Sequence, residues 1–154
     1  MDNTEQHDIV ESAAFKLHRA TALVDRLADR YLQEHHGIRY SAFLVLLTIG
    51  TVGQLTQRQI ADKLDVSRAS ITQRLGRLLD DDLVTARPHP DDARANTISL
   101  SRNGTELLER AWRGLETHQD GVDQGVDVTA LVQQLDRIID NALRVLNADA
   151  EERP

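Results

Sequence analysis

Cysteine is absent from this chain of 154 residues, and aromatic side chains make up only 3% of it. Without thiols, the chain has no means of forming a disulfide, a thiolate metal site or a thiol redox switch. It also lacks an apolar run of about 18 residues, as a membrane-spanning helix requires, and its first residues do not have the layout of a secretion signal. We therefore expect a cytoplasmic protein, away from the membrane, whose core is packed by aliphatic side chains.

Catalytic and metal-binding motifs are equally scarce. The sequence has no Gly-rich phosphate loop, nucleophile elbow or paired-histidine motif. His35 and His36 are adjacent, so their side chains leave a helix in different directions, and no histidine–glutamate pair at i, i+4 spacing accompanies them. We expect no cofactor, no metal centre and no enzymatic activity.

The net charge of −7 is unevenly distributed. Residues 1–53 carry −2, residues 54–102 carry +1 and residues 103–154 carry −6. Within the middle segment lies SRASITQRLGRLL, residues 67–79, which holds three arginines and no acidic side chain. Because a local basic patch rather than the total charge decides nucleic-acid binding, this stretch is the first candidate for contact with a polyanion.

Two long amphipathic helices are expected at the ends of the chain. Apolar residues recur at alternating spacings of three and four from Val10 to Tyr31, which predicts a helix over about residues 8–34 that is closed by Gly37. A similar stripe over residues 128–146 predicts a second long helix. Such stripes are typical either of the core of a monomeric bundle or of helices that pack across a two-fold axis in a homodimer.

Between these ends lie three shorter helical signals. The stretch SAFLVLLTI, residues 41–49, is apolar nearly all round and predicts a buried helix. In the next stretch, Thr56 and Gln59 have the spacing of a capping box, and Ser67 can cap the helix that follows. Two capped short helices joined by a tight turn predict a helix-turn-helix.

Downstream of this motif the hydrophobic period changes from that of a helix to that of a strand. Residues 83–87 are β-prone, and apolar and polar residues alternate over 97–100, with a Pro- and Asp-rich tip between them. Ser101 can then cap a further helix. The predicted fold is mainly α with a small β-hairpin wing: a winged helix-turn-helix with long N- and C-terminal dimerisation helices.

The helix expected over residues 67–80 has two contrasting faces. A helical wheel places Ile71, Leu75 and Leu78 on one buried stripe, opposite a small, uncharged centre that a major groove about 12 Å wide can admit. Gly76 lies on this outward face and costs roughly 1 kcal/mol of helix propensity relative to alanine. Close approach of DNA would explain this glycine, and a packing neighbour would explain it equally well.

Side chains around that outward face can read DNA. Gln73 can pair with adenine, Arg77 or Arg74 with guanine, and serine or threonine hydroxyls with a base or a phosphate. The alternative for any single polar residue is an ordinary contact with solvent. The DNA-binding residues predicted on this helix are Ser67, Arg68, Ser70, Thr72, Gln73, Arg74 and Arg77.

The order of these elements resembles the MarR (multiple antibiotic resistance regulator) family of winged helix-turn-helix transcription factors. The resemblance covers nearly the whole chain and is most specific in LTQRQIADKLDVSRASITQRLGRL, the following LV, the DDARA of the wing and ISLSRNGTELL. An Asp-x-Arg pattern in the wing of that family is matched here by Asp92 and Arg94. The resemblance implies that Arg94 enters the minor groove, whose negative potential attracts arginine, and that Asp92 helps to hold it.

The resemblance also implies partners. These are a second copy of the chain, a pseudo-palindromic double-stranded DNA operator, and a small aromatic or anionic effector. Repression is the commoner outcome of operator binding in the family. Residues 1–36 and 103–154 would form the dimerisation helices, and residues 37–102 the DNA-binding domain. The effector would bind where the two meet, and its candidate contacts, each of which also suits a plain core or surface role, are His18, Arg19, Tyr40, Phe43 and Trp112.

Three features depart from the family pattern. Asp80, Asp81 and Asp82 stand where the recognition helix usually closes with glycine, and carboxylates there oppose the helix dipole. Two roles are open for them: pairing with Arg87 or Lys63, or reducing non-specific affinity for phosphates. Gln73 stands where a basic residue is common. Residues 39–40 replace the usual capping residues, which leaves the start of the buried helix weakly specified.

One alternative function comes from another class of protein. A winged helix that binds protein and no longer uses DNA would agree with the acidic total charge. The arginines at positions 68, 74, 77 and 94 favour DNA instead.

Overall fold

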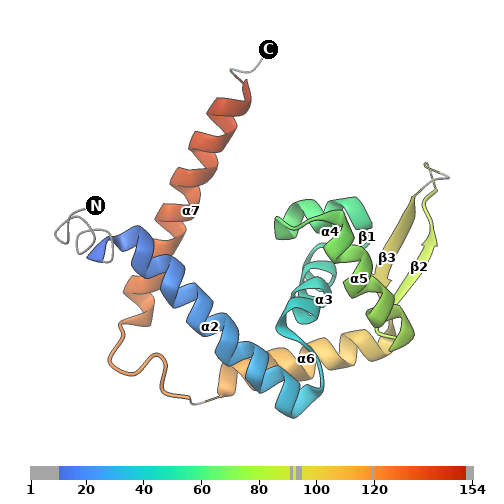
Figure 1. Ribbon diagram of the computed structural model, residues 1–154, viewed down its shortest axis with the longest axis horizontal. Helices are drawn as coiled ribbons and strands as arrows, with labels where there is room; N and C mark the ends of the chain where they lie inside the picture. Colours follow the sequence, from blue (N-terminus) through green and yellow to red (C-terminus); the bar gives the residue numbers. More distant parts are fainter. Residues whose placement is uncertain (1–10, 91, 93–94, 119, 152–154) are drawn as a thin grey trace. The chain divides into compact units, whose positions relative to one another are not determined.

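The computed structural model describes residues 11–90, 92, 95–118 and 120–151, and its contacts divide the chain into two units, residues 1–118 and 119–154 (Figure 1). The elements are α2 (Ala13–His36), α3 (Tyr40–Val52), β1 (Leu55–Thr56), α4 (Gln57–Leu64), α5 (Arg68–Asp80), β2 (Val84–Pro88), β3 (Asn96–Leu100), α6 (Arg102–Thr117) and α7 (Val128–Glu151). Within the described ranges, none of these helices is long and apolar enough to cross a membrane. The predicted fold class, mainly helical with a small β wing, is confirmed.

A capping residue at each end of α2 explains where this helix begins and ends. The Ser12 hydroxyl accepts a hydrogen bond from the backbone N–H of Phe15 at 3.3 Å, as an N-cap does. Gly37 ends the helix in the left-handed conformation, with a φ of 66°, as predicted. The helix therefore extends two residues beyond the predicted end near residue 34, and the predicted start near residue 8 lies outside the described residues.

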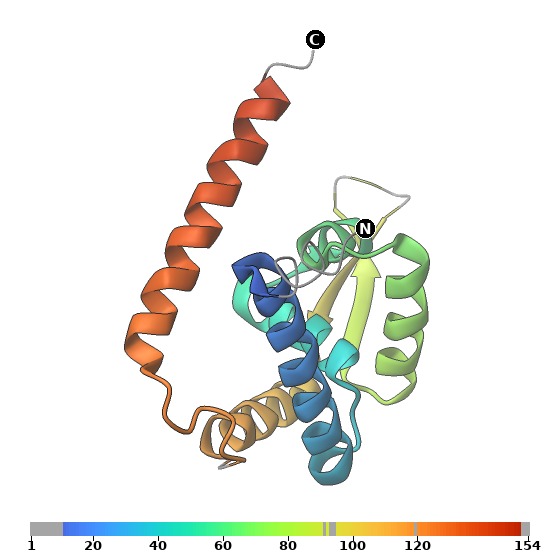
Figure 2. The ribbon, with the colours of Figure 1, turned by 60° about the vertical axis from the view of Figure 1, so that its left-hand side comes forward.

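The start of α3 is fixed by a residue from the preceding helix. Its N-cap residue, Arg39, makes no capping hydrogen bond through its side chain. The backbone N–H of Tyr40 instead donates to the Asp29 carboxylate of α2 at 2.8 Å. This carboxylate satisfies one of the amide groups that a helix start leaves unpaired, so the start of α3 is specified although no local residue caps it. Figure 2 shows how α2 leads through a short turn into α3.

Helices α4 and α5 form the predicted helix-turn-helix. The capping box of α4 is complete, because Thr56 accepts from the backbone of Gln59 and the Gln59 side chain accepts from the backbone of Thr56. Asp65 then ends α4 with a φ of 50°, and the Ser67 hydroxyl accepts from the Ser70 N–H at 3.2 Å to begin α5. The turn between the two helices consists only of residues 65–67, and so short a connection restricts the direction of α5 relative to α4.

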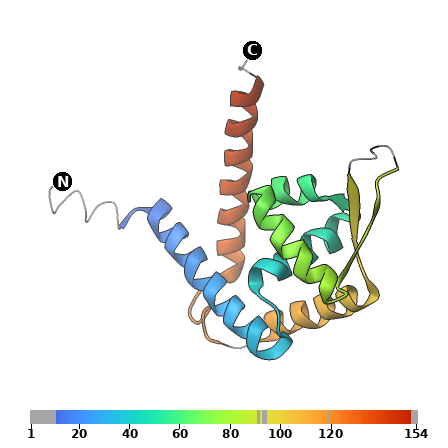
Figure 3. The ribbon, with the colours of Figure 1, turned by 45° about the vertical axis from the view of Figure 1, so that its right-hand side comes forward.

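The wing belongs to a three-stranded antiparallel sheet rather than to a two-stranded hairpin. Its strand order is β1-β3-β2, with Leu55 opposite Ile98 and Val84 opposite Leu100. Figures 1 and 3 show β2 and β3 extending as a hairpin past α4 and α5. Strand β1 was not predicted from the sequence, because two residues are too short a segment to show an alternating pattern.

The core joins the helices to this sheet. It consists of aliphatic side chains and one phenylalanine, and the largest fully buried members are Phe43, Leu32, Leu46, Ile49, Ile60, Ile71, Leu78 and Val45. Helix α3, apolar nearly all round, contacts α2, α4, α5, α6 and β3, as the prediction of a buried helix requires.

Helix α6 begins where the end of α5 turns into β2. The Ser101 hydroxyl caps α6 by accepting from the Gly104 N–H at 2.9 Å, and it also donates to the Asp82 carbonyl at 2.6 Å. A Cβ on Gly104 would lie 1.9 Å from the carbonyl oxygen of Leu83. Only glycine lets the two segments approach this closely.

Helix α7, which forms the second unit, exposes the apolar stripe predicted from the sequence. The Asp127 carboxylate accepts from the Ala130 N–H at 3.0 Å, which fixes the start of this helix. Its exposed large apolar side chains are Val128, Leu131, Val132, Ile138, Ile139, Leu143, Val145 and Leu146. A contiguous apolar face of this length marks a surface for a partner.

Candidate nucleic-acid interface

The two faces of α5 lie as the sequence predicts. Ile71, Leu75 and Leu78 are buried against the core, with at most 4% of each side chain exposed. On the opposite face Gln73, Gly76 and other small or polar residues are exposed. The outward centre of α5 is therefore narrow and uncharged, which is the shape that entry into a major groove requires.

The predicted DNA contacts differ in how exposed they are. Five of them are exposed on α5 or at its N-cap, namely Ser67, Arg68, Thr72, Gln73 and Arg77. Two are half-buried: Ser70, and Arg74, whose guanidinium donates to the Ser41 carbonyl of α3 at 3.4 Å. Asp92 is exposed in the wing, and Arg94 lies outside the described residues.

A groove of about 640 Å³, here called the wing groove, runs along one flank of α5. It is lined by the N-terminus of α4, by α5 and by the base of the wing, including Arg58, Arg68, Thr72 and Gly76. Gln57, which sequence reasoning missed, bridges α4 and α5 here. Its side-chain amide donates to the Thr72 hydroxyl and, at 3.4 Å, to the Arg68 carbonyl, so it orients one of the predicted contacts.

Packing within the described residues does not explain why position 76 is a glycine. An added Cβ would meet no atom within 4 Å. Of the two explanations left open by the sequence, a packing neighbour is therefore removed, and a close approach by a binding partner remains.

The opposite flank of α5 borders a second groove, of about 450 Å³, here called the turn groove. It lies between α5 and the turn that joins α2 to α3. Its polar lining residues are Arg39, Ser41, Ser70, Gln73, Arg74, Arg77 and Asp81. Three arginines against one carboxylate make its described lining strongly cationic.

The acidic end of α5 has a structural explanation at Asp82. This residue takes the left-handed conformation, with a φ of 52°, in the position where a helix usually ends on glycine. The N–H of Leu83 then bonds the Leu78 carbonyl at 2.8 Å. The Asp82 carboxylate accepts from the Asn103 side chain of α6 at 2.9 Å, rather than from the Arg87 or Lys63 suggested by the sequence.

The predicted effector contacts are spread over three helices. His18 and Arg19 are exposed on α2, and Trp112 is 44% exposed on α6. Tyr40 stacks against the buried Phe43 with ring centroids 6.4 Å apart. Burial, and then the charge of Asp25 and a hydrogen bond with its carboxylate, raise the pKa of Tyr40. The role of these residues in binding an effector stays a prediction.

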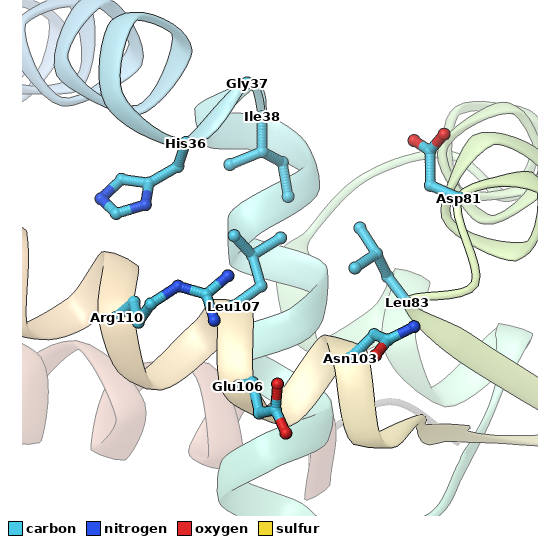
Figure 4. A pocket seen from close by; sticks show the side chains of 9 residues that line it. All are labelled: His36, Gly37, Ile38, Asp81, Leu83, Asn103, Glu106, Leu107 and Arg110. Atoms are coloured by element: carbon cyan, nitrogen blue, oxygen red, sulfur yellow. The ribbon is translucent and has the colours of Figure 1, made fainter.

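A further cavity, of about 410 Å³, lies beside α6 and is lined by none of those five residues. Figure 4 shows His36 beside Arg110 at one end of it, and Asp81 and Asn103 toward the other. The Nε2 atom of His36 is buried and makes no hydrogen bond within the described part of the chain. Burial, together with the charges of His35 and Arg110, lowers the pKa of His36.

Comparisons with known proteins agree with this geometry. The sequence profile of the MarR family matches residues 36–95. Over 98 residues the chain is 30% identical to the multiple antibiotic resistance protein MarR of Salmonella typhimurium, an alignment that covers 62% of this chain and 67% of that protein. It is 32% identical over 96 residues to an HTH-type transcriptional regulator of Bacillus cereus, and there the alignment covers 62% of this chain and 63% of the relative.

Solved structures share the fold. A cysteine-to-serine mutant of MarR from E. coli, complexed with operator DNA, superposes with a TM-score of 0.72 at 23% identity and covers 90% of this chain and 99% of its own. The transcriptional repressor CouR, bound to a 23-mer DNA duplex, gives a TM-score of 0.76 at 22% identity, with coverage of 88% and 95%.

Proposed function

The chain belongs to the MarR family, and from this premise we propose that it is a sequence-specific DNA-binding transcriptional regulator that acts as a homodimer on a pseudo-palindromic operator. The observation that carries the proposal is the outward face of α5, which is narrow and uncharged at its centre and bears exposed Gln73 and Arg77. A helix with such a face fits the major groove and can hydrogen-bond to base edges. Binding rather than catalysis is therefore the activity proposed, in the cytoplasm where bacterial operators lie.

The homodimer follows from the apolar faces at the two ends of the chain. Leu17, Leu23 and Val24 of α2 are exposed, as is the stripe on α7. Burial of such faces between two copies would stabilise a dimer through the hydrophobic effect. Two recognition helices related by a two-fold axis would then enter successive major grooves, with half-site centres about 10–10.5 base pairs apart.

Roles within the interface follow from position and charge. We assign base contacts to Gln73 and Arg77, and backbone contacts to the hydroxyls and to Arg68. Asp92 and Arg94 are assigned to the wing contact in the minor groove, as the family resemblance implies. A small aromatic or anionic effector that weakens the DNA complex, and repression as the outcome, complete the proposal. A thiol switch forms no part of it, because the chain contains no cysteine.

The test begins with DNA from upstream of the chain's own gene and its neighbours, searched for an inverted repeat. A gel-shift series with that duplex should give a discrete complex. Gln73→Ala should cost about 1–3 kcal/mol at mainly one base position, whereas Arg94→Ala should weaken binding to all sequences. Equal weakening of all sequences by Gln73→Ala would remove its base-reading role.

Salt dependence separates this function from the protein-binding alternative. Neutralisation of phosphates releases counterions, so the logarithm of DNA affinity should fall steeply with the logarithm of salt concentration. Weak binding that hardly changes with salt would favour a winged helix that binds protein.

A further inference from the structure

We propose that the turn groove binds the phosphodiester backbone of DNA, with Arg39 as a phosphate-binding residue. The inference rests on the proposed function and extends the interface beyond α5 and the wing, to the turn between α2 and α3. Arg39 is not among the DNA contacts predicted from the sequence. It was noted there only as a residue that does not cap the start of the buried helix.

The turn groove is cationic, and Arg39 is an exposed residue of its lining. Arg39, Arg74 and Arg77 line it against the single carboxylate of Asp81 among the described lining residues. Arg74 is held by the Ser41 carbonyl. Arg39 is the more exposed of the two, because 64% of its side chain is accessible and its ion pair with the Asp29 carboxylate, 3.5 Å long, lies at the surface. An exposed ion pair of this kind is weak, so the Arg39 guanidinium can turn to a phosphate.

A helix that lies in a major groove has DNA backbone on both of its sides. An α-helix with its side chains is about 10–12 Å across, which nearly fills a groove about 12 Å wide. A sugar-phosphate backbone borders that groove on each side, so both flanks of α5 must face phosphates. The wing groove offers Arg58 and Arg68 on one flank. On the other flank, the turn groove adjoins Ser70 and Gln73 and offers Arg39.

The hydrogen-bond donors of the turn groove match the oxygens of a phosphate. A guanidinium presents paired N–H groups that bind two phosphate oxygens, and serine hydroxyls such as those of Ser41 and Ser70 can donate beside it. These contacts carry no sequence information, so they position the helix rather than select a base. A small free anion has the same chemistry as a DNA phosphate, and the experiment must distinguish the two.

The experiment compares Arg39→Ala with Arg113→Ala, which removes the same charge from an exposed position on α6 that lines neither groove. The probe is a fluorescent duplex of random sequence, about two helical turns long, since phosphate contacts need no operator. Anisotropy titrations at several salt concentrations give the affinity and its salt slope, and circular dichroism verifies the fold of each variant.

We expect Arg39→Ala to weaken binding by about two- to fivefold and to reduce the salt slope by about one. Arg39→Lys, which keeps a cation, should retain the slope, and Arg113→Ala should behave as the unmodified protein. An unchanged affinity and slope in Arg39→Ala, or a loss of affinity without a change of slope, would overturn the proposal. The second result would assign Arg39 a purely structural role.

Two further outcomes separate the alternatives. If inorganic phosphate raises the melting temperature of the unmodified protein but not of Arg39→Ala, while both bind DNA equally, the groove is a small-anion site and the proposal is wrong. If the unmodified protein binds no duplex, the proposed function fails and the inference fails with it. If it binds DNA and Arg39→Ala binds equally well, only the inference fails.

Discussion

Replacement of Gly76 by alanine is expected to stabilise the fold and to weaken DNA binding at the same time. Gly76 lies within α5, where glycine costs about 0.8–1.0 kcal/mol relative to alanine. Because an added Cβ meets nothing within 4 Å, the chain can accept the methyl group without strain. The free energy of unfolding should therefore rise by up to about 1 kcal/mol, which corresponds to roughly 2–4 °C in melting temperature for a domain of this size.

Gly76 lines the wing groove, so the same methyl group would be added to the surface of the recognition helix that borders this groove. If DNA approaches the backbone of α5 there, the methyl group takes space that the duplex needs. Overpacking of a close contact by one carbon costs about 1–3 kcal/mol, so affinity for an operator duplex should fall about fivefold or more.

The assay for Gly76→Ala pairs urea unfolding with anisotropy titrations of an operator duplex. Unfolding must be compared at one protein concentration, because the stability of a dimer depends on concentration. A loss of stability would refute the reasoning about free space and helix propensity. A gain of stability with unchanged DNA affinity would refute the close approach, and the glycine would then have no functional reason.

Three more substitutions test the fold itself. Gly104→Ala should destabilise by about 3 kcal/mol or more in urea unfolding, since its Cβ would lie 1.9 Å from the Leu83 carbonyl oxygen and its nearest contacts are all with the Leu83 backbone. An unchanged unfolding midpoint would contradict that packing. Asp29→Ala should lower the free energy of unfolding by about 0.5–2 kcal/mol, because the Tyr40 N–H loses its acceptor. Asp29→Asn keeps an acceptor oxygen and should lower this free energy by less. Equal losses of stability in the two variants would show that the charge of Asp29, and not its hydrogen bond, is what stabilises the fold. The pKa of His36 is lowered in the folded chain, so the unfolded chain takes up a proton first as pH falls below 6.5, and the free energy of unfolding should decrease there. His36→Gln should reduce this dependence of stability on pH. Parallel stability profiles of the two proteins between about pH 7.5 and about pH 5.5 would argue against this role of His36.

Local patterns were sufficient to predict most helices and the two faces of α5. The caps at Thr56 and Ser67 act on amides three residues away, and the burial of Ile71 follows from the helical period, so both are readable from a short stretch of sequence. The helix-turn-helix and its outward face were predictable for that reason.

Features that depend on distant residues were not predictable in this way. Asp29 caps α3 from 11 residues away, and Asn103 binds the Asp82 carboxylate from 21 residues away. Neither pairing leaves a periodic or spaced signal in the chain. The position of Asp82 did carry a partial signal, because aspartate is one of the few residues that tolerate the left-handed conformation that ends a helix.

In the candidate site, the same distinction separates what was found from what was missed. The contacts on α5 share one helix, so their residues could be assigned to one face. Gln57 and Arg39 reach that face from other elements, and only the folded chain brings them to it.

The hydrogen bond from Tyr40 to Asp29 also sets a rule for constructing hybrid regulators. A DNA-binding segment transplanted between relatives at Gly37, the obvious loop junction, would receive its α3 cap from the recipient's helix rather than from its own. A recipient without an acceptor at the position of Asp29 would leave the first turn of the grafted α3 uncapped. A crossover placed before residue 29 transfers both halves of the contact together, and hybrids joined there should fold more stably than those joined at the loop.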